Sequence, residues 1–111
     1  MSDTWNKRAS DMLRNLNLYK NSIRCMREMS LSDKSDELAD RLRQTERTVA
    51  CVEGALDMLT DEERFILDKM LINADRQPVL DLCEECYCEK SNLYRLRKRA
   101  LGKFTMAIYG R

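Results

Sequence analysis

The stretch "CEECYCEKSNLYRL", residues 83–96, decides the fold expected for this chain. A helix-turn-helix needs apolar or small side chains on the inner faces of two short helices and in the turn between them. The stretch and the residue before it provide such side chains at Leu82, Cys83, Cys86, Cys88, Leu93 and Leu96. The sequence therefore predicts two short helices that cross at a steep angle, with the turn near Cys88.

The second of these helices, at about residues 89–101, then presents mainly hydrogen-bond donors to solvent. Phosphates and base edges are recognised by donors, so this helix is predicted to enter the major groove of duplex DNA. Contacts to bases are expected near its start, from Lys90, Ser91, Asn92 and Arg95. Contacts to phosphates are expected from Tyr94, Arg97, Lys98, Arg99 and Lys103.

The charge distribution favours the same end of the chain. The formal net charge is only +1, so no overall field attracts nucleic acid. Acids outnumber bases over residues 32–69, whereas residues 90–103 hold six bases and no acid. A local basic surface is therefore expected near the C-terminal end.

Upstream, two heptad seams predict two long helices joined by a short connection. The first seam consists of Trp5, Ala9, Met12, Leu16, Tyr19, Ile23 and Met26, and the second of Leu38, Leu42, Thr45, Val49, Val52, Leu56 and Leu59. Between them "SLSDKSDE", residues 30–37, offers Ser32 or Ser35 as the N-cap of the second helix. Such a connection predicts an antiparallel hairpin, about 32 Å long at 1.5 Å per residue. A further face of the hairpin is expected to be covered by the C-terminal half or by a second protomer, and it carries Leu13, Leu18, Ala50 and Met58.

A third helix is predicted from "LTDEERFILDKML", residues 59–71, which opens with a capping box between Thr60 and Glu63. Its buried face is expected to hold Phe65, Ile66, Met70 and Leu71. Pro78 fits the first position of the helix that follows, where its missing N–H costs nothing. With one proline and three glycines in 111 residues, the fold class is all-α. We predict a helical hairpin over residues 1–58 for assembly or partner contact, and a three-helix DNA-binding domain over residues 59–111.

Residues 59 to 110 resemble the fourth domain of bacterial sigma factors and, more closely, phage-encoded transcriptional regulators of the ArpU and RinA type. The matching features are "LTDEERFIL" (59–67), "SNLYRLRKRAL" (91–101) and "FTMAIYG" (104–110). The resemblance implies a sequence-specific DNA-binding regulator of phage or prophage genes, with RNA polymerase as one candidate partner. Two residues depart from the family pattern. Tyr87 stands in the turn where glycine is usual, and Glu89 stands where a serine normally caps the recognition helix.

The cysteines allow a second interpretation of the turn. Cys83, Cys86 and Cys88 suggest zinc, but the chain has no histidine and helix packing already requires small apolar side chains there. Structural thiols and no metal or other cofactor are therefore expected. Without histidine, and with glycines that form no phosphate-binding loop, the chain is not expected to be an enzyme.

Location and assembly are the remaining expectations. The sequence has no apolar run long enough for a membrane span and no signal-peptide pattern, so we expect a cytoplasmic protein of a bacterial cell or phage-infected host. The N-terminal helices form the hairpin within one chain or dimerise with a second copy. Two other functions stay open: a small-terminase-like DNA-packaging subunit, and a helical interaction module whose basic helix is merely exposed.

Overall fold

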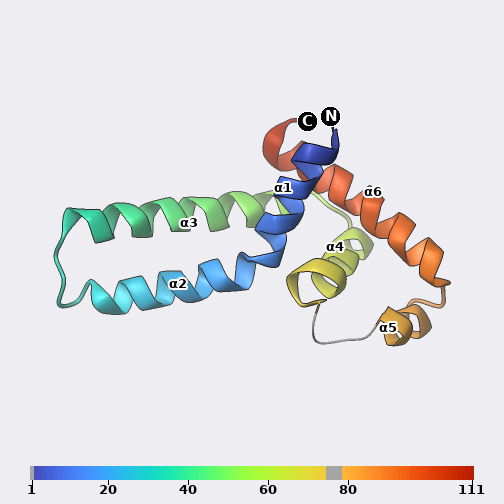
Figure 1. Cartoon of the computed structure of the whole chain (residues 1–111), viewed down its shortest axis with the longest axis horizontal. Coiled ribbons are helices and arrows are strands. Elements are labelled where there is room, and N and C mark those ends of the chain that lie inside the picture. Colours follow the sequence, from blue (N-terminus) through green and yellow to red (C-terminus); the bar gives the residue numbers. More distant parts are fainter. Residues whose placement is uncertain (1, 75–78) are drawn as a thin grey trace.

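The computed structural model describes residues 2–74 and 79–111, and every regular element within them is helical (Figure 1). The all-α prediction is confirmed. In chain order the elements are α1 (Ser2–Arg14), α2 (Leu16–Met29), α3 (Asp36–Leu56), α4 (Asp61–Leu67), the π-helical turn η1 (Asp68–Ile72), α5 (Val79–Glu85) and α6 (Lys90–Tyr109). None of the described helices is both long and apolar enough to cross a membrane.

Helices α2 and α3 lie side by side, run in opposite directions and project away from the rest of the molecule (Figure 1). Ser35 caps α3, because its Oγ accepts a hydrogen bond of 3.3 Å from the Leu38 N–H. Two ion pairs cross between the helices. Arg27 pairs with Glu46 at 2.8 Å, and Lys20 pairs with Glu53 at 3.2 Å.

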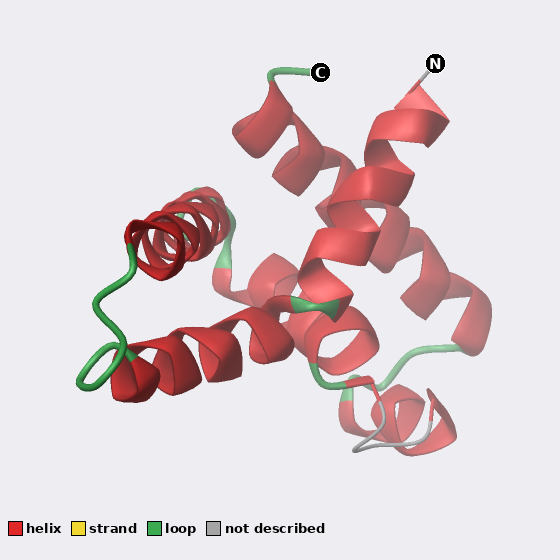
Figure 2. Ribbon diagram, turned by 60° about the vertical axis from the view of Figure 1, so that its left-hand side comes forward, coloured by secondary structure: helices red, strands yellow, loops and turns green. Residues whose placement is uncertain are grey.

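The expectation that one helix carries the whole first seam is wrong. The chain breaks at Asn15, whose φ of −97° and ψ of 3° are not helical. The Asn15 side chain donates to the Asp11 carbonyl oxygen at 2.9 Å, and the Asn15 backbone N–H donates to the same oxygen at 3.1 Å. An asparagine that bonds a carbonyl one turn back competes with regular helix geometry. At this residue α1 leaves the direction of α2 and packs against α6 (Figure 2).

The main core gathers apolar side chains from both halves of the chain. Leu13 and Leu16 on either side of the break are buried with Val52 of α3, Leu67 of α4 and Phe104 of α6. The core therefore crosses the boundary predicted between residues 58 and 59. The two parts share one core, and their division into separate roles stays a prediction.

A smaller second core lies between α4, η1, α5 and the start of α6. Its buried members are Ile66, Met70, Leu82 and Leu93, with partly buried Phe65, Val79, Cys83, Cys86, Cys88 and Leu96 packed around them. All the residues expected on the inner faces of α5 and α6 thus meet in one cluster. Cys83, Cys86, Cys88 and Leu96 keep some exposure at its edge.

Helix α4 begins with the predicted capping box. The Glu63 N–H donates to Thr60 Oγ1 at 3.2 Å, and the Thr60 N–H donates to Glu63 Oε1 at 2.9 Å. The π-helical continuation η1 was not predicted. It ends where the Asn73 N–H donates to the Asp68 carbonyl oxygen at 2.7 Å, and Asn73 Oδ1 accepts at 3.0 Å from the side chain of Asn17 on α2.

The α4–η1 segment separates the two cores. Ile66 and Met70 point into the second core, whereas Leu67 and Leu71 point into the main core. Of the face expected to be covered, only Leu13 is buried, and Leu18, Ala50 and Met58 are exposed. The expected helix start at Pro78 lies outside the described residues, and α5 is described from Val79.

Candidate nucleic-acid interface

The start of α6 is held by one face only. The chain turns between Glu85 and Lys90, and Leu93 then anchors α6 in the second core without any exposed surface. Further along, Ala100 and Phe104 bury the same side of α6 in the main core. The other side of the first three turns remains open to solvent.

The predicted contact residues divide into three groups around α6. Ser91, Arg95 and Lys98 follow one another at spacings of four and three, so they share the face opposite Leu93 and Ala100. On one flank, Lys90 and Arg97 lie over the Tyr94 ring at 6.0 Å and 5.3 Å from its centre. Asn92, Arg99 and Lys103 form the other flank. All nine predicted contact residues are exposed except Arg97, which is half-buried.

The basic side chains differ in whether a carboxylate neutralises them. Lys103 Nζ pairs with Glu63 Oε2 at 2.9 Å, so this residue already serves to join α6 to α4. Within the described part of the chain, Arg95, Lys98 and Arg99 form no ion pair. These three cations are available to an anionic ligand.

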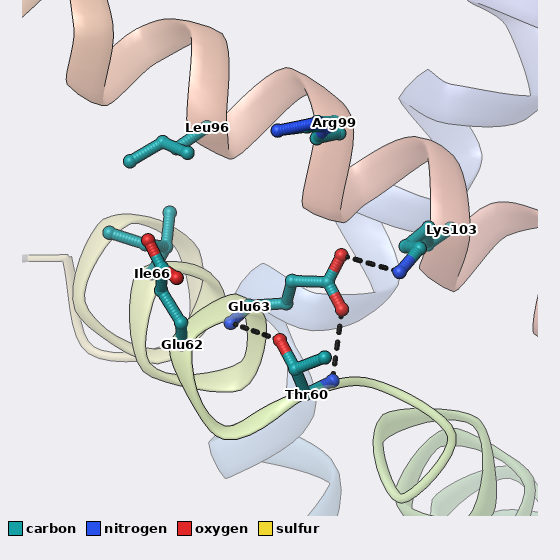
Figure 3. Close-up of a pocket in the computed structure, with 7 residues that line it drawn as sticks. All are labelled: Thr60, Glu62, Glu63, Ile66, Leu96, Arg99 and Lys103. Carbon is teal, nitrogen blue, oxygen red and sulfur yellow. Dashed lines mark hydrogen bonds and ion pairs between the residues drawn. The ribbon is translucent and has the colours of Figure 1, made fainter.

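Arg99 and Lys103 also line a pocket of about 330 Å³ between α6 and α4 (Figure 3). The α4 side of this pocket holds Thr60 and Glu63, whose capping box is drawn with the ion pair to Lys103. Hydrogen bonding from the Thr60 backbone, followed by that from the Lys103 ammonium, holds the pKa of the Glu63 carboxyl below its ordinary value of 4.5. The ionised form of Glu63 is therefore the form that the fold stabilises.

Glu63→Gln should lower the free energy of unfolding by about 1 kcal/mol near pH 7, because glutamine keeps the capping hydrogen bond but loses the charge that meets Lys103. The pKa in the folded chain is lowered, so this stabilisation is present above the ordinary pKa and is lost as pH falls through it toward the lowered value. Urea unfolding at about pH 7 and about pH 3 should show the difference between wild type and variant shrinking on acidification. Glu62→Gln, at an exposed neighbour, should show no such change. If wild type and Glu63→Gln differed equally in free energy of unfolding at both pH values, the ion pair with Lys103 would not be the cause of the difference.

Tyr87 lies in the turn between α5 and α6 with a φ of 53°, the left-handed conformation that favours glycine. It is the position where the sequence lacks the expected glycine, and the backbone adopts the glycine-like geometry nonetheless. The side chain is 96% exposed, so no burial offsets the strain, which is of the order of 1 kcal/mol.

Tyr87→Gly should raise the free energy of unfolding by about 0.5 kcal/mol, because relief of the left-handed strain exceeds the added entropy of the unfolded chain. Tyr87→Ala is the matched control, since alanine removes the ring but keeps the strain. Chemical denaturation of both variants measures the effect. A gain in the alanine variant equal to that in the glycine variant would show that the ring, and not the backbone, is the source.

Glu89 is the other residue that differs from the regulators that the sequence resembles. Glu89 occupies the N-cap position of α6 with extended backbone angles, but its side chain makes no capping hydrogen bond. The first N–H groups of α6 are thus left without a side-chain cap at the end that carries Lys90, Ser91 and Asn92. Free N–H groups at a helix start attract anions.

The three cysteines near the turn, Cys83, Cys86 and Cys88, pack against the second core. Among the described residues, no group of three cysteine or carboxylate side chains could hold a metal ion. Burial, followed by the neighbouring Cys88 and Glu85, raises the pKa of the Cys86 thiol from its ordinary value of 9.0. A raised pKa keeps this sulfur as the neutral thiol that apolar packing favours.

Comparison of the chain with models of protein families, with curated proteins and with solved structures found no match. The likeness of residues 59–110 to sigma-factor domains and to ArpU and RinA type regulators therefore stays a prediction. The function proposed below depends on the geometry of α5 and α6.

Proposed function

We propose that the chain binds double-stranded DNA through α5 and α6, arranged as a helix-turn-helix, and regulates transcription of phage or prophage genes. The observation that carries this proposal is the exposed set of Arg95, Lys98 and Arg99, which form no ion pair within residues 2–74 and 79–111 and lie on a helix whose opposite face is buried. On α3, by contrast, Arg41 lies 4.0 Å from Glu37 at the i,i+4 spacing of a helical ion pair.

The start of α6 is the part that would enter the major groove. Lys90, Ser91 and Asn92 lie at its free, positively polarised end, and Arg95 follows one turn later on the same side as Ser91. In the proposal these four residues contact bases. Lys98 and Arg99, two turns into the helix, contact the phosphates that border the groove.

The remaining predicted phosphate contacts have smaller roles in this arrangement. Lys103 is held by Glu63, and Arg97 is half-buried beside the Tyr94 ring. Tyr94 can still donate its hydroxyl to a phosphate.

The acids near the turn restrict how DNA can approach. Asp81 and Glu84 on α5 and Glu89 in the turn are exposed and negatively charged. Phosphates would avoid this side of α5, so the duplex must lie over the Ser91, Arg95 and Lys98 face of α6.

The test is the salt dependence of binding to duplex DNA. Neutralising about two phosphates per protomer, by Lys98 and Arg99, predicts a slope of about −2 in a plot of log K against log salt. Selection of bound duplexes from a random library, followed by titration of the selected site, measures both the sequence preference and the slope. A slope close to zero on the best duplex would contradict the proposal.

A further inference from the structure

The α2–α3 hairpin has a face that no other described helix covers. This face is distinct from the proposed DNA-binding surface. We define it as the groove face, and it consists of Leu18, Tyr19, Ser22, Cys25, Met26 and Met29 on α2 and Arg41, Gln44 and Thr45 on α3. All of these except Leu18 line one groove of about 440 Å³ between the two helices. Leu18, Ser22, Cys25 and Met29 follow at spacings of four, three and four, which is the repeat of a helix-packing seam.

This seam faces solvent. Leu18 is 60% exposed and Met29 is 51% exposed, although both are large apolar side chains. The hairpin projects from the body of the molecule in both views, so no other described helix covers it along its length (Figures 1 and 2). The seam on the opposite side of α2 is the one that packs against α3 and the core, through Leu16 and Ile23.

The groove face also differs in charge from the other edge of the hairpin. The ion pairs Lys20–Glu53 and Arg27–Glu46 join α2 to α3 without contributing to the lining of the groove. Of the residues that line the groove only Arg41 is charged, and it lies 4.0 Å from Glu37 one turn back on its own helix. A face with so little charge would not select an acidic or a basic partner.

We propose that a second copy of the chain docks on the groove face, so that two hairpins form a four-helix bundle. An isologous interface brings each patch against itself, which is unfavourable for a charged patch and favourable for a neutral apolar one. The seam from Leu18 to Met29 supplies the apolar residues, and small polar side chains such as Ser22 let the helices approach closely.

The size of the face indicates a weak dimer. At 1.5 Å per residue the seam is about 17 Å long, and two helices are roughly 20 Å wide, which gives on the order of 340 Å² per copy. The total of roughly 700 Å² is below the area of about 1,200–2,000 Å² that stable specific interfaces bury, so a weak, reversible dimer is expected.

Sedimentation equilibrium of the full chain without DNA tests the proposal over protein concentrations of about 1–500 µM. Wild type should pass from monomer to dimer within this range. The double variant Leu18→Glu, Met29→Glu should stay monomeric, and Leu18→Ala, Met29→Ala should weaken the dimer at least about tenfold because it removes most of the buried apolar seam. Both sites are largely exposed in the monomer, so far-UV circular dichroism should be unchanged.

Met58→Glu is the control, since Met58 is an exposed methionine, more exposed than Met29, that lies outside the groove. This variant should dimerise like wild type. A wild-type monomer throughout, a dimer that survives Leu18→Glu, Met29→Glu, or an equal loss in Met58→Glu would each overturn the proposal.

Two further measurements test the dimer independently of DNA binding. Alkylation of the exposed Cys25 should slow as wild-type concentration rises but not in the Leu18→Glu, Met29→Glu variant. The dimer dissociation constant should change little between about 0.05 M and 0.5 M salt, because Arg41 is the only charged residue among those that line the groove. A strong salt dependence would contradict the docking mode, whatever the outcome of the DNA titrations.

Discussion

Replacing Arg95, Lys98 and Arg99 together by alanine should lower the affinity for duplex DNA by roughly a thousandfold at about 0.1 M salt. Each phosphate neutralised contributes about 0.9 to the salt slope, which at this salt concentration is close to one decade of affinity. Loss of the two phosphate contacts proposed for Lys98 and Arg99 therefore removes about two decades and reduces the slope by about two. Loss of the base contact proposed for Arg95 costs about 1–3 kcal/mol more, roughly one further decade of affinity, and relaxes the sequence preference at that position.

The matched control for this triple variant removes the same charge elsewhere. Lys7, Arg14 and Arg47 are exposed on α1 and α3 and do not belong to the proposed DNA-binding face of α6, so their replacement by alanine should reduce affinity far less. An equal loss in both triple variants would mean that only net charge matters. Unchanged affinity in the α6 variant, with a normal melting temperature, would favour the interaction-module alternative.

The inner faces around the turn could be predicted because their signals are local. Thr60 and Glu63 are three residues apart, so the capping box can be read from the sequence. Likewise the apolar positions that surround Cys88 leave only one way for α6 to bury Leu93 and expose Ser91 and Arg95. The sequence leaves the backbone at Tyr87 open, because a residue other than glycine either avoids the left-handed conformation or adopts it at a cost, and the structure has it left-handed with a φ of 53°.

The break at Asn15 could not be predicted from periodicity. The first seam runs through residue 15 without losing its spacing, and one asparagine costs a helix only about 0.7 kcal/mol. The outcome depends on distant partners. Ala9 is buried in a core shared with α6, Asn17 bonds Asn73 after η1, and Ile23 packs with α3. A single straight helix could not make all three of these contacts.

Long-range pairing also limited the prediction of the site. Whether a lysine on α6 is free depends on carboxylates far away in the chain, and Glu63 lies 40 residues before Lys103. The helical spacing within α6 carries no information about that pair. It did identify the exposed face, because the faces of one helix follow from its buried residues alone.

Phe104→Ala should lower the free energy of unfolding by about 3–5 kcal/mol, which is a large share of the 5–15 kcal/mol typical of such proteins. Phe104 has no exposed surface and belongs to the core that joins α1, α3 and α6. Its truncation removes the contact area of a large ring and leaves a cavity between helices that cannot all move together. The midpoint of thermal unfolding should fall by about 10–20 °C. Met106→Ala, at an exposed position on the same helix, should change stability by less than about 0.5 kcal/mol.

Phe104→Ala also tests whether residues 1–58 and 59–111 unfold as one cooperative unit. Trp5 is the single tryptophan, and its ring centre lies 5.1 Å from that of Tyr109, so its fluorescence reports on the contact between α1 and the end of α6. Far-UV circular dichroism reports on all helices, including α2 and α3. Because Phe104 links residues on both sides of position 58, both signals should shift together in urea and keep a single transition. If the Trp5 signal moved to lower urea while a large part of the helix signal did not, residues 1–58 and 59–111 would be unfolding separately, and the main core would contribute less to stability than its burial indicates.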